Sequence, residues 1–383
     1  MMAEEKKPEI YSPQPPHPVL IVNRSKEDNF GAGALHKESI LVIITLSMVI
    51  LGIETSCDET SAAIVKDGML LSNATAVQLF HSDHGGVVPE LASRAHQRIM
   101  IPVVEEALRN ASINKNNIDA IAAVYGPGLI GSILIGLSFG KGMAMGLGIP
   151  FIGINHMEAH IFSNMIEEPR PSFPFVNLTV SGGHTQLVFV KDYFETELLG
   201  ETMDDAAGEA FDKVAKMLGI GYPGGPLVDK FAAKGNAKAV KFPRPYLAEG
   251  SLQFSFSGLK TSVLYYLRKA GFDKTANVNE AFVADVCASF QAAVVDVLIA
   301  KLLTAAEKYN VHDIAVCGGV SANSELRRRL AWEAKIHRKQ LFIPKLEFCT
   351  DNGAMVAQAG YERMRKGFIS NLELTAEPNL HMN

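Results

Sequence analysis

Short apolar runs alternate with longer segments of helical periodicity from residue 48 to about residue 370. Runs rich in β-branched residues predict buried strands, and apolar residues spaced three and four positions apart predict amphipathic helices. The predicted strands are 49–53, 62–65, 118–124, 151–154, 175–180, 186–190, 313–317 and 340–343. The predicted helices are 90–110, 132–147, 206–218, 279–309 and 324–335. This alternation is typical of a mixed α/β fold.

A strand-turn-strand unit near residue 50 recurs near residue 177, which predicts two related lobes.

Residues 1–38 carry several prolines and mixed charges without any periodicity, and we expect a disordered tail there. The apolar run 40–53 is too short for a membrane span and leads directly into a polar motif, so we interpret it as a buried strand. Met48 offers an alternative start that would make residues 1–47 an extension without a role in the fold. Mass spectrometry of the native N-terminus tests this.

The 383 residues are 48% hydrophobic and carry a net charge of −5. This length favours two domains or two lobes. A nucleic acid would have to be held by a local basic patch or by a partner, because the whole chain is not a polycation. The four cysteines form no CxxC pair. Their spacing indicates a reducing compartment and excludes a disulfide framework or a cysteine-rich zinc site.

Three polar turns have the composition of phosphate-binding loops. Residues 54–61 and 180–185 each lie between two apolar strands, and residues 317–323 join a strand to a helix through Gly318 and Gly319. Paired glycines allow close backbone approach to a ligand, and a helix N-terminus attracts anions. The turn 54–61 fits a solvent-exposed hairpin equally well. No Walker A loop and no GxGxxG after a first strand occur, which argues against P-loop chemistry and a dinucleotide-binding fold.

A possible metal site follows in the segment 156–160. His156 and His160 share one face if this segment is helical, so both imidazoles can bind one cation. Asp351, at a predicted strand-to-helix turn, is the candidate third ligand. Two histidines and a carboxylate suit Fe(II) or Zn(II). The alternative is a pair of polar helix histidines, and the order differs from the HExxH motif of zinc proteases.

Other polar clusters have two interpretations each. His81, His84 and His96 fit structural or substrate-contact roles better than metal binding. The acidic run Asp204, Asp205, Glu209 and Asp212 is either a solvated helix face or a set of acceptors for ribose hydroxyls. The basic stretch 327–345 is either an RNA-facing surface or an exposed amphipathic helix.

The motifs jointly and in order resemble one family. GIETSCDET, HGGVVPELASRAH, YGPGLIGSI, NHMEAH, VSGGHTQLV, DDAAGEAFDK, YPGGP, FSFSGLKT, GGVSAN and CTDNGAM are similar to those of the TsaD family, tRNA threonylcarbamoyladenosine transferases. These proteins were formerly described as O-sialoglycoprotein endopeptidases, or the glycoprotease family. The resemblance covers about residues 48–370 and is to the bacterial or organellar branch. Residues 1–47 have no counterpart in the family core.

The resemblance implies an α/β fold of the actin-like ATPase superfamily, shared with sugar kinases, Hsp70 and actin. Two RNase H-like lobes would surround a nucleotide cleft. The expected N-terminal lobe is 48–170, completed by a C-terminal helix at about 351–370. The expected C-terminal lobe is 171–350, flanked by the extension 1–47 and a tail at 371–383.

The resemblance also implies an activity, tRNA N6-adenosine threonylcarbamoyltransferase. The threonylcarbamoyl group would move from threonylcarbamoyl-AMP to adenosine 37, directly 3′ of the anticodon, in tRNAs reading ANN codons, with release of AMP. It implies one divalent metal, Fe²⁺ or alternatively Zn²⁺, on His156, His160 and Asp351. The implied substrate contacts are Val180, Ser181, Gly182, Gly183, His184, Asp212, Gly225, Asp229 and Asn323. His184 and water are the candidate general bases.

A cytoplasmic enzyme is expected, working without a membrane and with a paralogous partner, TsaB, and a small ATPase, TsaE. Three other functions stay open. A small-molecule kinase would share the phosphate turns but leave the two histidines unexplained. A metalloprotease would need a general-base glutamate beside the metal, and Glu158 lies on another helix face than His156. A non-catalytic assembly subunit would not need the metal residues.

Overall fold

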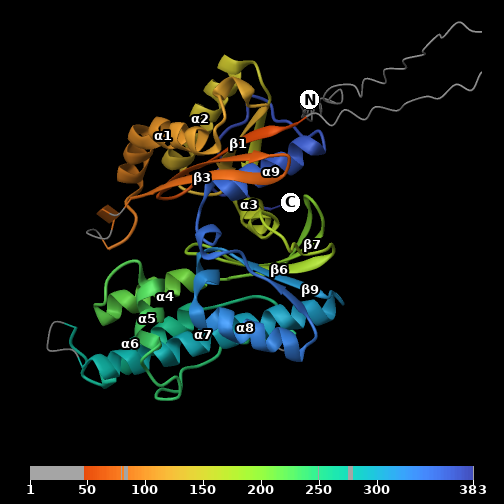
Figure 1. The fold of residues 1–383 in the computed structure, drawn as a ribbon. Coiled ribbons are helices and arrows are strands. Elements are labelled where there is room, and N and C mark those ends of the chain that lie inside the picture. The colour runs from red at the N-terminus through yellow and green to blue at the C-terminus, as the bar shows by residue number, and fades with distance from the viewer. Residues whose placement is uncertain (1–46, 79, 82–84, 249, 275–278, 383) are drawn as a thin grey trace, which may run out of the picture.

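The computed structural model describes residues 47–78, 80–81, 85–248, 250–274 and 279–382. The predicted tail at 1–38 and the first part of the apolar run 40–53 lie outside the described residues. The described chain forms two lobes, each built on one five-stranded sheet (Figure 1). The first lobe lies at the top of the view and the second at the bottom.

The two sheets share one topology. The first has the order β3-β2-β1-β4-β5, and the second has the order β10-β9-β6-β7-β8. In each, the leading strand pairs antiparallel with the next strand and parallel with a later one. The first-lobe strands are β1 (Val49–Glu54), β2 (Glu59–Lys66), β3 (Met69–Val77), β4 (Ala120–Gly126) and β5 (Phe151–Asn155). The second-lobe strands are β6 (Phe175–Val180), β7 (Thr185–Asp192), β8 (Glu195–Glu201), β9 (Asp313–Cys317) and β10 (Gln340–Phe342). The predicted repeat of a strand-turn-strand unit is therefore confirmed.

Helices cover both sheets. The α-helices are α1 (Pro89–Ala111), α2 (Ile130–Leu147), α3 (His156–Phe162), α4 (Ala207–Leu218), α5 (Gly224–Ala232), α6 (Ser257–Lys269), α7 (Glu280–Lys308), α8 (Ser324–Ile336) and α9 (Gly353–Arg365). The 3₁₀ helices are η2 (Lys115–Asn117), η3 (Ser163–Met165), η4 (Gly319–Ala322) and η5 (Leu346–Phe348). The helix α7 is the central core helix of the second lobe, with most of its side chains buried.

The chain returns to its first lobe at the end. The helix α9 packs against β1 and β2, and the blue helix beside the red strand in Figure 1 shows this return. The approach is so close that a Cβ at Gly52 would lie 2.3 Å from the backbone nitrogen of Ala357. Only glycine fits at this position in β1 without moving α9. This contact brings Asp351, just before α9, next to the end of β1.

Several elements differ from the predicted ones. The edge strands β3 and β8 and the helices α5 and α6 were not predicted, whereas every predicted strand and helix is present with ends shifted by a few residues at most. The helix α5 begins at Gly224, inside the YPGGP motif. Pro226 lies in the first turn of this helix, where its missing N–H donor leaves no bond unmade.

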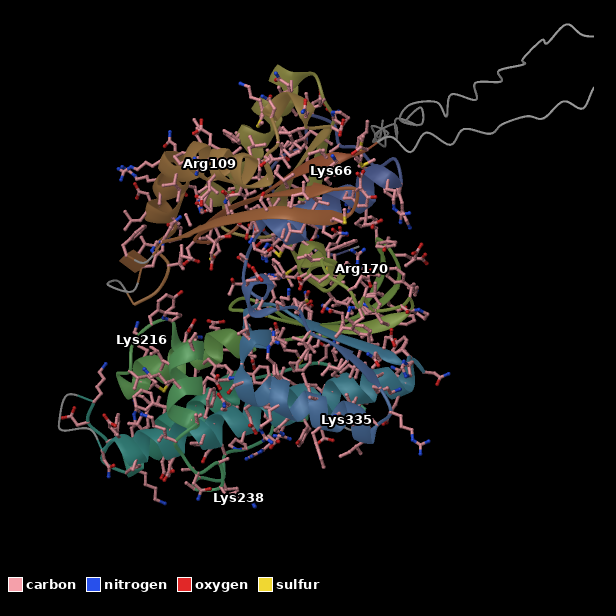
Figure 2. All side chains as sticks on the ribbon, viewed as in Figure 1. Lys66, Arg109, Arg170, Lys216, Lys238 and Lys335 are labelled. Atoms are coloured by element: carbon pink, nitrogen blue, oxygen red, sulfur yellow. The ribbon has the colours of Figure 1, made fainter. Side chains whose placement is uncertain are left out.

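Two described helices, α2 and α7, are long and apolar enough to cross a membrane. Of the α7 window 83% is buried inside the second lobe, as expected of a core helix, whereas only 33% of α2 is buried. The four cysteines are free thiols, in agreement with the predicted absence of a disulfide framework. Cationic side chains occur on both lobes, such as Arg109 on the first and Lys216, Lys238 and Lys335 on the second (Figure 2).

Candidate functional site

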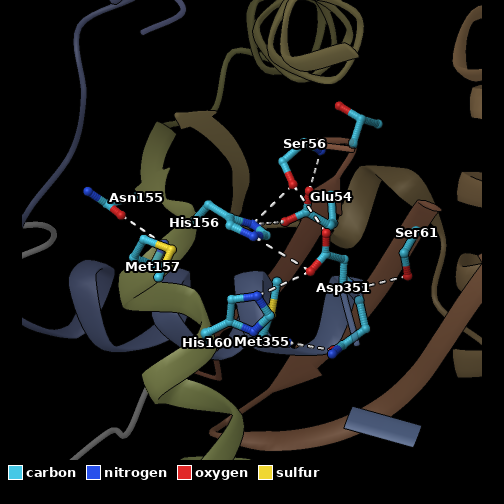
Figure 3. Close-up of polar contacts among 12 residues, drawn as sticks. Glu54, Ser56, Ser61, Asn155, His156, Met157, His160, Asp351 and Met355 are labelled. Atoms are coloured by element: carbon cyan, nitrogen blue, oxygen red, sulfur yellow. Dashed lines mark hydrogen bonds and ion pairs between the residues drawn. The ribbon is translucent and has the colours of Figure 1, made fainter. Parts of the chain in front are cut away.

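His156 and His160 lie side by side on α3, directly after β5. Asn155 caps this helix, because its side-chain oxygen accepts a hydrogen bond from the Met157 backbone N–H at 2.8 Å. The two imidazole rings meet edge to face with centroids 4.6 Å apart. Asp351 approaches them from the turn before α9, with Oδ1 at 3.1 Å from His160 Nε2 and 3.6 Å from His156 Nε2 (Figure 3). The structure thus brings all three predicted metal residues together.

This trio fits a metal ion in its chemistry and its unmet contacts. One ligand atom from each of the three residues lies within 4.8 Å of the others. His160 is fully buried, and its Nε2 faces Asp351 Oδ1 at 3.1 Å, whereas its Nδ1 is a buried polar atom with no hydrogen-bond partner among the described residues. Leaving such a group without any partner is costly. Two imidazoles and a carboxylate with open positions are a donor set for Fe(II) or Zn(II).

The first polar turn, residues 54–61, contacts this trio through Glu54 and Ser56. Glu54 ends β1 with no solvent exposure, and its Oε2 lies 3.1 Å from His156 Nδ1. Its other oxygen accepts a hydrogen bond from the Ser56 backbone N–H. The Ser56 hydroxyl lies 3.1 Å from His156 Nδ1 and 3.5 Å from Asp351 Oδ2 (Figure 3). The predicted polar turn is therefore tied to the metal candidates and is not a solvent-exposed hairpin.

The electrostatics of the trio follow from this crowding. Burial lowers the pKa of His156, but the carboxylates of Asp351 and Glu54 outweigh burial and raise that pKa to about 9. Burial raises the pKa of Asp351, yet the neighbouring His156 and His160 bring it well below its usual range. Burial lowers the pKa of His184 to about 4, helped by the nearby His156 and His160. His184, in the turn between β6 and β7, is therefore neutral at pH 7, and the charges of both α3 histidines contribute to its lowered pKa.

The turn 180–184 is closed by its own backbone. The Ser181 N–H donates to the carbonyl of His184 at 2.8 Å, and the His184 N–H donates to the Ser181 hydroxyl at 3.1 Å. The helix α4 begins against this turn, where a Cβ at Gly208 would lie 2.4 Å from the Ser181 carbonyl oxygen. Nothing lies within 4 Å of a Cβ placed on Gly182 or Gly183, so the outer side of the turn is open to a ligand.

The third polar turn, residues 317–323, packs against the start of the turn 180–184. Gly318 has a φ of +87°, and a Cβ there would lie 2.4 Å from the Val180 carbonyl oxygen. Glycine is required for both reasons. The helix α8 then starts at Ser324 with Asn323 as its cap, accepting from the Leu326 N–H at 2.9 Å.

The remaining predicted substrate residues gather around α5. Asp212 on α4 accepts from the Gly224 N–H at 2.7 Å, which fixes the start of α5 beside Gly225. Asp229 on α5 accepts from the Ser324 hydroxyl at 2.8 Å and from the Asn323 amide at 3.3 Å. Asp212, Gly225, Asp229 and Asn323 therefore lie around the N-terminal halves of α5 and α8 in the second lobe.

The acidic run before α4 is not a solvated face. Asp204 accepts hydrogen bonds from the Phe256 and Ser257 N–H groups at 2.8 and 3.1 Å, so it caps α6 from outside the helix. Asp205 pairs with Lys213 and Lys260, each at 2.8 Å. These two carboxylates attach α6 to α4. The sequence signal that could have revealed this role is the run of serines at 255 and 257, whose hydroxyls also bond Asp204.

His81 and His96 have structural positions, as predicted. The His96 Nε2 lies 2.9 Å from the Cys57 carbonyl oxygen, and its Nδ1 lies 2.6 Å from the Thr60 hydroxyl. Gln78 joins His96 to His81. This chain of contacts holds the first polar turn against the base of α1. His84 lies outside the described residues.

The basic stretch 327–345 is partly committed to the fold. Arg327 donates to the carbonyls of Ser321 and Pro344, and Arg329 pairs with Asp296 at 2.5 Å. Arg328 is matched by Glu325 on the same helix. Arg327 and Arg329 hold α8 in place. Lys339 donates to the Val311 carbonyl and Lys345 pairs with Glu167, so most basic side chains of this stretch have protein partners. The RNA-facing interpretation therefore loses its main support.

Comparison with known proteins gives the family. A sequence profile of the TsaD family, described as tRNA N6-adenosine threonylcarbamoyltransferase, matches residues 69–358. The chain is 50% identical over 331 residues to the tRNA N6-adenosine threonylcarbamoyltransferase of Christiangramia forsetii, covering 86% of this chain and 96% of the relative. It is 52% identical over 334 residues to the protein of that description from Chloroherpeton thalassium, covering 84% of this chain and 94% of the relative.

Solved structures agree on the fold. HypF from T. kodakarensis matches 86% of this chain and 49% of its own chain, with a TM-score of 0.56 and 17% sequence identity. At this identity the likeness shows the fold alone, and it accords with the predicted actin-like architecture of two related lobes. The profile match and the relatives at about 50% sequence identity show more than the fold. They show that this chain belongs to the TsaD family of tRNA N6-adenosine threonylcarbamoyltransferases.

Proposed function

We propose that the chain transfers the threonylcarbamoyl group from threonylcarbamoyl-AMP to N6 of adenosine 37 in tRNAs reading ANN codons. The observation that carries this proposal is that His156, His160 and Asp351 meet at one point in a chain of the TsaD family. A phosphate-binding turn beside a metal-ligand trio suits an acyl donor activated as a phosphate anhydride. The new bond joins N6 to the carbamoyl carbon, the carbon–oxygen bond to AMP breaks, and AMP leaves with the electron pair.

The second lobe would position the donor. The open backbone of Gly182 and Gly183 would hold the departing phosphate, as backbone N–H groups in such turns do. Asp212 and Asp229 would accept hydrogen bonds from ribose hydroxyls, with Gly225 and Asn323 beside them. Holding the donor in one orientation turns the attack into a step between fixed partners, which lowers its barrier.

His156, His160 and Asp351 would hold one divalent ion, Fe²⁺ or Zn²⁺. When bound, such an ion supplies Lewis-acid polarisation of donor oxygens. His184 is neutral at pH 7 because its pKa is near 4, so a ring nitrogen is free to accept a hydrogen bond or the proton that leaves N6. His184 and water are the two candidates for accepting this proton.

The metalloprotease alternative is weakened by Glu158. This glutamate is buried and pairs with Arg363 of α9 at 2.6 Å, with Arg363 in turn lying over the Phe194 ring. A carboxylate neutralised in this way fastens α3 to α9 and is not available as a general base.

The test is nucleoside mass spectrometry of unmodified tRNA incubated with the chain, its partner proteins and threonylcarbamoyl-AMP. We expect threonylcarbamoyladenosine from the wild type and none from His160→Ala, whose far-UV circular dichroism should stay that of the wild type. Absence of product from the wild type, with partners that support a relative's activity in parallel, would overturn the transferase proposal. Equal product from His160→Ala would remove the metal from it.

We further propose the division into lobes 48–170 with 351–370 and 171–350, a cytoplasmic location, and partners of the TsaB and TsaE kinds.

The outward face of α2 supports the TsaB-like partner. Ile130, Leu134 and Met145 on this face are 46–67% exposed, and no atom lies within 4 Å of a Cβ placed on Gly142 or Gly146. Large apolar residues beside small ones suit the docking of another helix. Leu134→Glu should abolish co-purification of the partner without changing the melting temperature, and unchanged co-purification would refute this contact.

A further inference from the structure

A cavity of about 590 Å³ lies between the two lobes, outside the predicted donor contacts except for Asp212. Its size is that of a small-molecule or nucleoside site. One wall is residues 85–87 of the first lobe, and the opposite wall is built from α4 and the loop that follows it. The full lining is Gly85, Gly86, Val87, Glu209, Asp212, Lys213, Lys216, Gly219, Gly221 and Tyr222.

The first-lobe wall of this cavity leaves its backbone uncovered. Gly85 and Gly86 have open space where a Cβ would be, so a bulky ligand can approach their backbone. The opposite wall presents the Tyr222 ring, two more glycines, two lysines and the carboxylates of Glu209 and Asp212. An aromatic ring with nearby cations is the usual combination for unpaired nucleic acid, because bases stack on the ring and cations meet phosphates.

The two lysines differ in whether their charge is already paired with a carboxylate. Lys213 is matched by Asp205 and Glu209, each at 2.8 Å, so its charge is already neutralised. Lys216, one turn further along α4, is exposed and has no ion pair among the described residues. Figure 2 shows Lys216 on the edge of the second lobe that faces the first lobe. Lys216 is therefore the cation of this cavity that is available to an anionic ligand.

The first-lobe wall of the cavity is connected by hydrogen bonds to the first polar turn, residues 54–61. This wall is bonded to His81, since the Gly86 N–H donates to the His81 carbonyl and the Val88 N–H to His81 Nδ1, both at 3.3 Å. His81 connects through Gln78 and His96 to the carbonyl of Cys57. Burial raises the pKa of Tyr222, and the carboxylates of Asp58 and Asp212 raise it further. Ser56 of the first polar turn contacts His156.

We propose that this cavity is the entrance for the anticodon loop of the tRNA, with Lys216 on a backbone phosphate and Tyr222 stacked on a base. This inference rests on the proposed function, since the acceptor adenosine has to reach the metal trio and the donor at the same time. A phosphate of the donor is the competing ligand for Lys216. The position of the cavity outside Gly225, Asp229 and Asn323 favours the RNA.

The test compares Lys216→Glu with Lys238→Glu in the complete enzyme with its partners. Lys238 is also exposed on the second lobe but lies at its opposite, lower end (Figure 2). Charge reversal at Lys216 should raise the Kd and KM for unmodified tRNA roughly tenfold. It should also reduce the slope of log affinity against log salt by about 0.7 to 1, as expected for one lost phosphate contact. The KM for threonylcarbamoyl-AMP should not change, and Lys238→Glu should match the wild type in every respect.

The ring is tested separately. Tyr222→Ala should weaken tRNA binding roughly tenfold, whereas Tyr222→Phe should keep it, because stacking needs the ring and not the hydroxyl. Product from the wild type, with equal tRNA affinity of Lys216→Glu and Lys238→Glu, would refute the entrance and leave the transferase proposal intact. A higher KM for the donor in Lys216→Glu, with tRNA binding unchanged, would assign Lys216 to the donor phosphate and also refute the entrance. Failure of the wild type to form product refutes the proposed function itself.

Discussion

Glu54 determines how His156 is presented, although it does not belong to the predicted metal trio. Its carboxylate is fully buried and lies 3.1 Å from His156 Nδ1. A carboxylate in this place keeps the proton on Nδ1 and leaves Nε2 free to face Asp351 and a metal. The two histidines and Asp351 could be predicted from spacing and motif. The role of Glu54 could not, because it lies 102 positions from His156 and depends on how β1 meets β5 in space.

Glu54→Gln is expected to weaken metal binding by about 10- to 100-fold, the usual loss when an outer partner of a metal-binding histidine is removed. The amide is of the same size, so the fold should be retained. Metal affinity is measured by competition with a chromogenic chelator, which does not require turnover. Ser56→Ala serves as the matched control. It removes a neutral contact to the same His156 atom and should lower the affinity less. Equal metal affinity of Glu54→Gln and the wild type would contradict the positioning role.

At the scale of elements, the hydrophobic pattern of the sequence predicted the buried strands and the long helices but not the edge strands of the two sheets. The strand β3 exposes Met69, Leu71 and Val77, so it has apolar residues where a half-buried strand would have polar ones. The strand β8 is largely exposed and begins with acidic and polar residues. Each is recognisable only once its neighbour, β2 or β7, is in place. Strand propensity depends on such neighbours, and a sequence does not state them.

Helix α6 shows the same dependence, because its cap comes from Asp204, about fifty positions earlier in the chain. Burial raises the pKa of Asp204, but hydrogen bonds from Ser255, Ser257 and two backbone N–H groups outweigh it and lower that pKa. A group with a folded pKa below its unfolded value of about 3.9 stabilises the fold above that value. This stability is lost as the pH falls through the folded pKa.

Asp204→Ala is therefore expected to lower the free energy of unfolding by about 1 kcal/mol at pH 7, the typical loss of a helix cap. The difference from the wild type should shrink as the pH falls from about 4 towards the lower folded pKa. Urea denaturation followed by far-UV circular dichroism at pH 7 and pH 3 measures both effects. Glu195→Ala, at the exposed start of β8, should show neither. A difference that stayed constant or grew at pH 3 would mean that Asp204 does not act through its charged form.

At the scale of the whole molecule, the site joins parts that belong to different lobes. The metal trio lies on α3 and before α9, which pack with the first sheet, whereas His184 lies at the tip of the β6–β7 turn in the second. Aromatic contacts tie the same elements together away from the trio. Phe194, from the β7–β8 turn, stacks on Phe162 of α3 with centroids 5.0 Å apart and lies under the Arg363 guanidinium. The relative placement of the lobes therefore sets the distance between donor and metal.

Metal binding should stabilise the whole chain, because its ligands come from segments that only folding brings together. A metal that binds the folded chain alone adds about 2.7 kcal/mol at a free concentration one hundred times its Kd. For a chain of this size that corresponds to an increase in melting temperature of a few degrees. Removal of the metal with a chelator should lower the melting temperature of the wild type by this amount, and adding Fe²⁺ or Zn²⁺ back should restore it.

His160→Ala should melt at one temperature with or without metal, because it lacks the buried ligand at the centre of the trio. His312→Ala, an exposed histidine at the start of β9, should keep the full metal-dependent increase. If His160→Ala is stabilised by metal as strongly as the wild type, the ion binds elsewhere. The His160 Nδ1 would then be a buried polar atom that no ligand satisfies. The trio would also have no role in the reaction.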